Sequence, residues 1–248
     1  MQYTNLLLDV DGTLVGTEFS VVGHDDRLKN YINTYMHHNG KIGLVTGRGE
    51  QYVSALYEFL GLNGVRIIEM GAGIIFPNNE RIELTPLENK DEIIEFIKKR
   101  ELFRTFRLEP KSFMLTLMQH EFPNHDVIAL KKVYEEIKDQ FQENFPNANI
   151  TVDNHTIDIF NPKSDKGKAI EFYTKKLEVN LEKIAIAGDS RGDYPGFKVI
   201  GENNGLVCYV GLDENYAEEL KKEFQNCLIT KEKRSSGLVE LLNNLLEH

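Results

Sequence analysis

The stretch that decides the fold is LLLDVDGTL, residues 6–14. Three leucines lead directly into Asp9 and Asp11, and Gly12 and Thr13 follow at once. An apolar run that ends in a turn signal is typical of a buried strand. Where parallel strands end, their side chains face the crevice in which α/β proteins bind ligands. The stretch therefore predicts a buried strand that delivers two carboxylates to a ligand crevice.

The two aspartates pose an electrostatic problem in that position. If the strand continues through them, alternation places Asp9 and Asp11 on the same side. Neighbouring carboxylates repel each other, and burying both in the ionised form is costly. A divalent cation between them or a shared proton would relieve the repulsion. The alternative interpretation is structural: Asp9 caps the next segment and Asp11-Gly12 is only a turn.

The overall composition is that of an ordinary globular protein. The chain has 248 residues, 41% hydrophobic and 27% charged, which predicts one large or two modest domains. The net charge of −10 argues against a nucleic-acid partner, because such proteins usually carry a basic face. We see no signal peptide and no apolar run near the roughly 20 residues that span a membrane. We therefore expect a cytoplasmic protein, without a membrane partner, that is a monomer or a weak homodimer. The distant Cys208 and Cys227 are expected to be buried thiols.

The first and last parts of the chain alternate between strand and helix patterns. Strands are expected at 6–8, 41–46, 65–68, 183–189, 205–211 and 226–229, and helices at 26–38, 50–60, from Ser164 or Asp165 onward, 214–224 and 236–246. This alternation predicts a parallel sheet with right-handed crossovers.

The middle of the chain has a different pattern. A helix at 89–100 precedes a hairpin of 103–109 and 113–119, and a long helix within 123–145 precedes a hairpin of 149–153 and 156–160 across Asn154-His155. We therefore predict an α/β fold: a Rossmann-like core with a parallel sheet, formed by 1–77 and 162–248, and an inserted α+β cap at 78–161 with an antiparallel sheet.

Polar clusters follow several of the core strands or begin a helix. They are Asp9/Asp11, Thr46-Gly47-Arg48, Lys166, and Gly188-Asp189-Ser190 with Asp193. The carboxyl ends of parallel strands share one edge, so we expect these clusters to converge. Oxygen ligands from Asp9, Asp189 and Asp193 would suit Mg²⁺. Thr46 and Lys166 would contact phosphate oxygens, whereas Arg48 either binds substrate or pairs with an acidic neighbour.

The ordered set DVDGT, TGR, SDKGK and GDSRGD resembles the motifs of the haloacid dehalogenase superfamily. The core segments that carry it make up about two-thirds of the chain. The insertion is similar to the second cap type (variant IIB) of the Cof-type and sucrose-phosphatase-like proteins. The resemblance implies phosphoryl transfer through an aspartyl-phosphate, with a small phosphorylated metabolite as substrate and Mg²⁺ as cofactor.

The resemblance also implies roles for individual residues. Asp9 would be the nucleophile and a metal ligand, and Asp11 the general acid and base. The Asp11 carbonyl and Asp189 would complete the protein's metal ligands, and Asp193 would orient water or Lys166. Thr46, Gly47, Arg48 and Lys166 would form the phosphate-binding set. Two positions depart from the pattern: Gly192 and Met70 stand where relatives often have asparagine.

The cap is expected to set specificity, because the core contacts are generic for phosphate. The cap residues proposed to face the pocket are Lys111, Arg104, Arg107, His120 and His155, each with a solvated surface position as the alternative. Alternation along a strand would place Arg104 and Arg107 on opposite faces. Movement of the cap would gate the site.

The sequence thus predicts a Mg²⁺-dependent phosphatase, with a sugar phosphate as the expected substrate. One alternative is a phosphosugar mutase, which would need several cationic side chains in the cap to hold a bisphosphorylated intermediate. The other is a catalytically silent regulator that binds a sugar phosphate. Intact Asp9, Asp11, Lys166 and Asp189 favour an enzyme over the silent binder.

Overall fold

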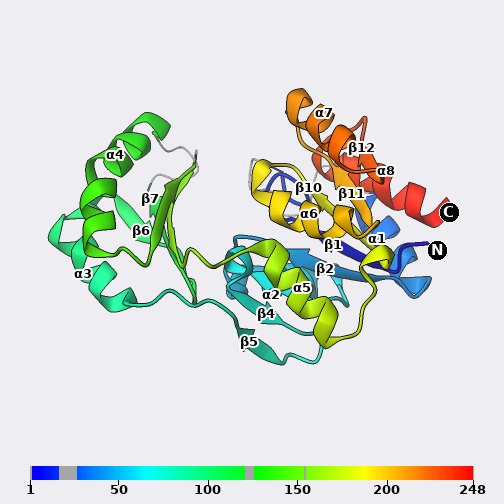
Figure 1. Cartoon of the computed structure of the whole chain (residues 1–248), viewed down its shortest axis with the longest axis horizontal. Helices are drawn as coiled ribbons and strands as arrows, with labels where there is room; N and C mark the ends of the chain where they lie inside the picture. Colours follow the sequence, from blue (N-terminus) through cyan, green and yellow to red (C-terminus); the bar gives the residue numbers. More distant parts are fainter. Residues whose placement is uncertain (1, 17–26, 121–125, 154, 248) are drawn as a thin grey trace.

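A computed structural model describes residues 2–16, 27–120, 126–153 and 155–247. It contains an eight-stranded core sheet and a separate four-stranded cap sheet (Figure 1). The predicted α/β core with an inserted antiparallel cap is confirmed. The expected helix start at Asp26 and the turn residue Asn154 lie outside the described residues.

The core sheet has the strand order β12-β11-β10-β1-β2-β3-β4-β5. The parallel strands are β1 (Asn5–Leu8), β2 (Lys41–Val45), β3 (Arg66–Ile68), β10 (Ile184–Gly188), β11 (Leu206–Tyr209) and β12 (Cys227–Ile229). The LLL stretch therefore lies between β10 and β2, near the middle of the sheet, where a strand is buried on both faces.

Two antiparallel strands extend this sheet beyond β3. They are β4 (Gly73–Ile75) and β5 (Arg81–Glu83), and β4 pairs with both β3 and β5. The core sheet is thus mostly, not wholly, parallel. Strand β5 falls within the segment 78–161 that the sequence assigns to the cap, yet its hydrogen bonds join it to the core sheet.

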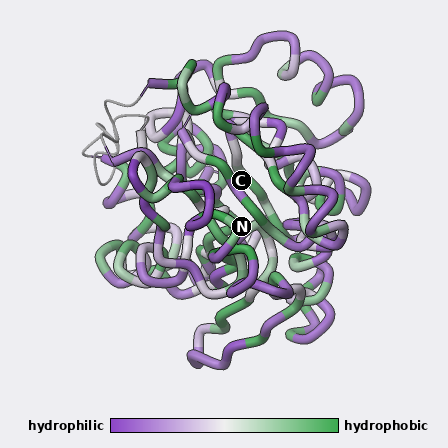
Figure 2. Tube along the Cα trace, turned by 90° about the vertical axis from the view of Figure 1, so that its left-hand side faces the viewer, coloured by the Kyte–Doolittle hydropathy of each residue, from purple (hydrophilic) through white to green (hydrophobic). Residues whose placement is uncertain are grey.

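Helices cover both faces of the core sheet. One face carries α1 (Leu28–His37), α2 (Glu50–Leu60) and α8 (Arg234–Glu247), and the other carries α5 (Lys166–Lys176), α6 (Tyr194–Glu202) and α7 (Glu214–Glu223). Leu6 and Leu8 pack in the first layer and Leu7 in the second, as alternation along a strand requires. Figure 2 shows the hydrophobic stretches running through the interior of the molecule, with hydrophilic segments outside.

The cap is a sheet covered on one face by two helices. Its order is β6-β7-β9-β8, with β6 (Phe106–Leu108), β7 (Leu115–Gln119), β8 (Asn149–Val152) and β9 (Thr156–Phe160), and its helices are α3 (Lys90–Lys99) and α4 (Val127–Asn144). Leu117 and Ile157 belong to the apolar cluster beneath these helices. Thr116 and Asp158 alternate with them and point to the opposite face. Figure 1 shows α3 and α4 on the side of the cap away from the core.

The predicted strand 103–109 is shorter in the structure. Residues Leu102–Arg104 form a 3₁₀ turn, and the strand begins only at Phe106. Strand alternation therefore does not relate Arg104 to Arg107. Elsewhere, Cys208 is buried, Cys227 is half-buried and both are free thiols. Within the described ranges, no helix combines the length and apolar character needed to cross a membrane.

Candidate active site

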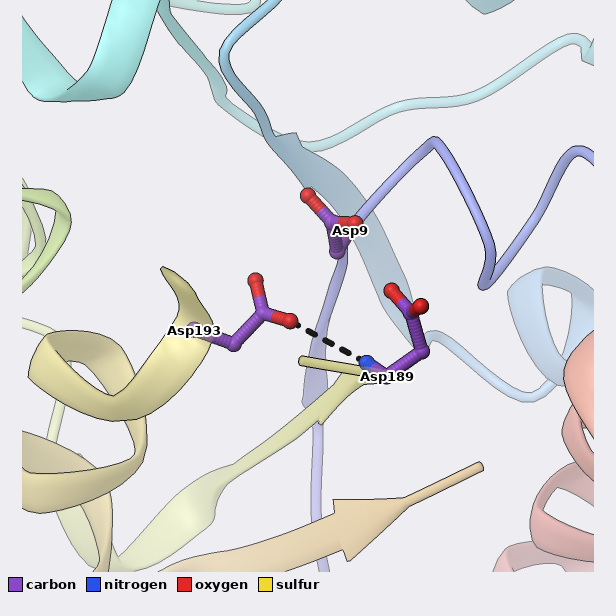
Figure 3. A group of neighbouring side chains, drawn as sticks. All are labelled: Asp9, Asp189 and Asp193. Atoms are coloured by element: carbon purple, nitrogen blue, oxygen red, sulfur yellow. Dashed lines mark hydrogen bonds between the residues drawn. The ribbon is translucent and has the colours of Figure 1, made fainter. Parts of the chain in front are cut away.

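Three carboxylates meet at the carboxyl edge of the core sheet. Asp9 follows β1 and Asp189 follows β10, and the parallel register pairs Leu8 with Ala187. Asp193 comes from the short turn between β10 and α6. One oxygen from each of the three carboxylates lies within 4.8 Å of the others. Figure 3 shows the three side chains converging, so the predicted acidic cluster is formed.

Lys166 brings a positive charge to this cluster. It is the first residue of α5, whose start is capped by Asp165: the side chain of Asp165 accepts a hydrogen bond from the amide of Lys168 at 3.0 Å. The buried Nζ of Lys166 donates to Asp9 Oδ1 at 2.9 Å and to Asp193 Oδ1 at 2.7 Å. Lys166 therefore joins the nucleophile candidate to the loop after β10.

The second oxygen of Asp193 organises that loop. Its Oδ2 accepts from the backbone amides of Asp189 and Ser190, each at 3.1 Å (Figure 3). The Ser190 hydroxyl in turn accepts from the amide of Gly192 at 3.2 Å, so glycine at this position participates through its backbone. Both oxygens of Asp193 are thus engaged, which suits a residue that holds Lys166 and the loop in place.

Close packing explains a glycine beside the carboxylates. Gly12 has a φ of +79°, a conformation that favours glycine. A Cβ atom there would lie 2.2 Å from Asp189 Oδ2, so the Asp189 carboxylate would have to move to admit it. The neighbouring Thr13 donates its hydroxyl to Asp189 Oδ1 at 3.2 Å. The DVDGT motif therefore contacts the Asp189 carboxylate directly.

The electrostatics of the cluster favour an additional positive charge. Burial, and then the nearby Asp193, raises the pKa of Asp9 well above its usual range, even though Lys166 acts in the opposite direction. The same two causes raise the pKa of Asp189 to about 6. Burial alone would lower the pKa of Lys166, but Asp193 and Asp9 raise it. Three carboxylates share one ammonium group, and this oxygen-rich donor set fits a hard divalent cation.

The Thr46-Gly47-Arg48 segment follows β2 at the same edge. Thr46 is buried, and its hydroxyl accepts from the amide of Arg48 at 3.1 Å. Arg48 donates from Nε and Nη2 to the two oxygens of Asp11, both at 2.8 Å. Of the two predicted roles for Arg48, the structure shows pairing with an acidic neighbour, in the bidentate geometry that arginine favours.

Arg48 also contacts the cap. Its Nη1 donates to Glu109 Oε1 at 3.2 Å, and Glu109 Oε2 lies 3.2 Å from Lys111 Nζ. Lys111 is almost fully buried and donates to the Thr116 hydroxyl at 2.7 Å. That hydroxyl donates in turn to Asp158, whose pKa is raised by burial. A continuous polar network thus runs from Asp11 in the core to β9 in the cap.

Among the five cap candidates, Lys111 is the one that this network includes. Arg104 pairs with Glu101 at 2.9 Å on the exposed surface, and a ring nitrogen of His120 contacts the carbonyl of Phe103 at 3.2 Å. Arg107 donates to Met118 Sδ at 3.5 Å. The His155 amide donates to Asp153 at 2.5 Å.

Glu109 and Asp158 belong to this network but are not among the residues that the sequence patterns single out. Glu109 stands at the end of β6 beside the Pro110-Lys111 turn, and Asp158 alternates with buried isoleucines along β9. Alternation along β9 predicts that Asp158 lies on the face of the cap sheet opposite the helices. No local signal identifies Glu109, because its significance depends on where the cap lies relative to Arg48.

Comparison with known proteins agrees with this geometry. A family model of haloacid dehalogenase-like hydrolases matches residues 6–127 and 122–207. A candidate phosphatase of Mycoplasma genitalium is 42% identical over 69 residues, which are 27% of this chain and only 23% of that protein. A phosphoglycolate phosphatase of Staphylothermus marinus is 24% identical over 253 residues, covering 96% of each chain.

Solved structures show the same fold. A haloacid dehalogenase-like hydrolase from Bacteroides thetaiotaomicron has a TM-score of 0.73 at 16% identity, covering 98% of this chain and 99% of that one. The sucrose-phosphatase of Synechocystis, solved with sucrose and phosphate, has a TM-score of 0.60 at 14% identity, covering 98% of both chains. With its four motifs gathered at one sheet edge beneath an inserted cap, the chain belongs to the haloacid dehalogenase-like hydrolases, in their Cof-type branch.

Proposed function

We propose that this chain is a Mg²⁺-dependent phosphatase that hydrolyses a small phosphorylated metabolite through an aspartyl-phosphate at Asp9. The observation that carries the proposal is the meeting of Asp9, Lys166, Asp189 and Asp193 at one sheet edge. A carboxylate nucleophile beside a buried cation is the arrangement that phosphoryl transfer requires, because the transferred group carries negative charge on its oxygens.

The metal site is part of the proposal. Asp9 and Asp189, with the backbone carbonyl of Asp11, would hold the cation. Asp193 is a further candidate metal ligand on its chemistry, but its hydrogen bonds support a positioning role toward Lys166 and the loop. When bound, Mg²⁺ would offset negative charge on the phosphate oxygens and on the carboxylates.

In the first step, a carboxylate oxygen of Asp9 would attack phosphorus, and the bond between phosphorus and the leaving oxygen would break. Asp11 would give its proton to that oxygen, so the alcohol leaves neutral. Water would then attack the phosphorus of the aspartyl-phosphate while Asp11 takes a proton from it. The bond between phosphorus and the Asp9 oxygen would break, which restores the Asp9 carboxylate and releases inorganic phosphate. Lys166 and Thr46 would hold the phosphoryl oxygens through both steps.

The ion pair between Asp11 and Arg48 must open for this chemistry. It occupies both oxygens of Asp11, so neither is available for proton transfer while it lasts. Glu109 already contacts Arg48 from the cap and offers it another partner. Substrate entry would therefore be coupled to the position of the cap through Arg48.

The cap network supports a sugar phosphate as the substrate. Its polar groups near Arg48 include the carboxylates of Glu109 and Asp158, which accept hydrogen bonds and therefore suit the hydroxyl groups of a sugar. The cation Lys111 is already paired with both. A carboxylate on the substrate, as in phosphoglycolate, would face these acidic groups, so we expect such a substrate to bind less well.

The test is phosphate release from a panel of hexose and pentose phosphates, polyol phosphates, nucleotides and phosphoglycolate, with Mg²⁺ or with a chelator. We expect metal-dependent release, fastest from sugar phosphates. A preference for phosphoglycolate would overturn the substrate class but not the chemistry. Transfer of phosphate between hydroxyls with little free phosphate would identify a mutase, and ligand-induced thermal shifts without turnover would identify a silent binder. The cytoplasmic location and the monomeric or weakly dimeric state stay predictions.

A further inference from the structure

The buried carboxylate of Glu69 is unused by the mechanism above. Glu69 lies in the core just after β3, and its side chain has no solvent exposure. It accepts three backbone hydrogen bonds from one segment of the cap: Oε1 from Ser112 at 2.8 Å, and Oε2 from Phe113 at 2.6 Å and Met114 at 3.0 Å. A carboxylate that accepts several amide hydrogen bonds makes strong, charge-assisted contacts.

The same segment of the cap is held by further contacts. The ammonium group of Lys90 donates to the carbonyls of Lys111 and Ser112 at 2.7 and 3.0 Å. The segment also packs tightly on the core, since a Cβ added to Gly49 would lie 2.5 Å from the carbonyl oxygen of Pro110. The amides of this turn therefore bind an anion of the core, while its carbonyls bind a cation of the cap.

The backbone around Glu69 adopts an unusual conformation. Glu69, Met70 and Gly71 have φ values of 51°, 60° and 89°, so two side-chain-bearing residues in succession are left-handed. Such conformations cost energy and persist where the surroundings enforce them. The amide of Glu69 donates to the carbonyl of Arg48 at 3.1 Å, and the amide of Met70 to that of Thr46 at 3.1 Å. The strained segment is thus fastened to the phosphate-site loop.

We infer that Glu69 is a positioning residue, which anchors the cap turn 109–114 to the phosphate-site loop 46–48 and so sets where the cap faces the substrate. The turn carries Glu109, which contacts Arg48, and Lys111, which contacts Glu109 and Asp158. Loss of the anchor would let these groups move while the catalytic edge, built on the core strands, stays assembled. The inference rests on the proposed phosphatase function, because its readout is the binding of a substrate.

The first arm of the test measures amide hydrogen exchange in the full wild-type chain. We expect the amides of residues 112–114 to exchange as slowly as those of the core strands, because each donates to the carboxylate of Glu69, which has no solvent exposure. Fast exchange there, beside slow exchange in β1 and β10, would overturn the inference without any variant.

The second arm compares Glu69→Gln and Glu69→Asp with Glu83→Gln, which changes an exposed glutamate on β5. Glutamine keeps only one of the two accepting oxygens, whereas aspartate keeps both. We expect Glu69→Gln to speed exchange at 112–114 and to raise KM for the best sugar phosphate about tenfold, which corresponds to about 1.4 kcal/mol. Glu69→Asp should recover part of both effects, and Glu83→Gln should change neither.

Acetyl phosphate as substrate distinguishes a positioning role of Glu69 from a general structural role. Its small leaving group has little to contact in the cap, so Glu69→Gln should leave its kcat and KM within about twofold of wild type. Equal losses for acetyl phosphate and the sugar phosphate would indicate a merely structural role and overturn the inference. So would an unchanged KM for the sugar phosphate. If the wild type released no phosphate from any compound, the proposed function would fail instead. Hydrogen exchange at residues 112–114 would still test whether Glu69 anchors the turn.

Discussion

The catalytic edge of the core and the facing turn of the cap use charge in different ways. At the core edge, strand ends deliver Asp9 and Asp189, and their carboxylates outnumber the single ammonium of Lys166. In the cap, Lys111 lies between Glu109 and Asp158 and is already neutralised. The excess negative charge in the core is what a divalent metal site requires, whereas the carboxylates of Glu109 and Asp158 in the cap suit the hydroxyl groups of a sugar. Under the proposed function, the core edge would therefore carry the chemistry and the facing turn of the cap would select the substrate.

The most direct way to break this comparison is to remove the nucleophile. Asp9→Asn should lower kcat by about 10³-fold or more for every substrate, because an amide does not form the acyl phosphate. The measurement is phosphate release at saturating substrate, with the exposed Asp139→Asn as the matched control. Equal activity in Asp9→Asn would show that another group carries the chemistry.

Removal of the buried cation should affect both activity and folding. Lys166→Met leaves Asp9 and Asp193 without their shared partner, so we expect the free energy of unfolding to fall by about 3 kcal/mol in the absence of metal. Activity should fall by about 10²-fold. Urea denaturation and phosphate release would measure the two effects, with the exposed Lys168→Met as control. Unchanged stability would mean that the ion pairs are not formed in solution.

A change in the cap should alter selectivity and leave the chemistry intact. Glu109→Gln keeps the size of the side chain but removes its charge, and it weakens the contacts with Arg48 and Lys111. We expect KM for sugar phosphates to rise about tenfold, and phosphoglycolate to become a relatively better substrate. The exposed Glu101→Gln is the control. A drop in kcat alone, the same for all substrates, would place Glu109 with the catalytic edge instead.

The smallest expected effect is a pH dependence of stabilisation by Mg²⁺. Because the pKa of Asp189 is raised to about 6, the folded, metal-free protein keeps this proton while an unfolded chain loses it near pH 4. Its contribution to stability is therefore present below about pH 4 and is lost as the pH rises through about 6. The cation needs the ionised carboxylate, so the gain in Tm from Mg²⁺ should be larger at about pH 7.5 than at about pH 5.

Thermal unfolding with and without Mg²⁺ at the two pH values measures this gain. In Asp189→Asn, which has no proton to lose at this position, the gain should be small and should vary less with pH. A gain in the wild type that is the same at both pH values would show that Asp189 does not bind the metal.

The core motifs were predictable because they are local. An apolar run that ends in DVDGT predicts a strand that ends beside Asp9, from consecutive residues alone. The parallel pattern of the core then brings Asp189 to the same edge. The sequence likewise predicts a helix through Lys166 with Ser164 or Asp165 as its cap, and the structure shows Asp165 in that role. The antiparallel extension of the core sheet by β5 was missed, because a three-residue strand next to a predicted insertion carries no signal of which sheet it joins.

The sequence by itself thus determined the parallel part of the core sheet, the four core motifs and the presence of a cap, because these follow from hydrophobic periodicity and from residues that lie at the ends of regular elements. Only the tertiary structure decided how Arg48 is used, since Asp11 and Glu109 approach it from two different parts of the chain. It also decided the role of Glu69, whose partners are backbone amides more than forty residues away. Such contacts depend on how two sheets are placed relative to each other, and no local pattern encodes that placement.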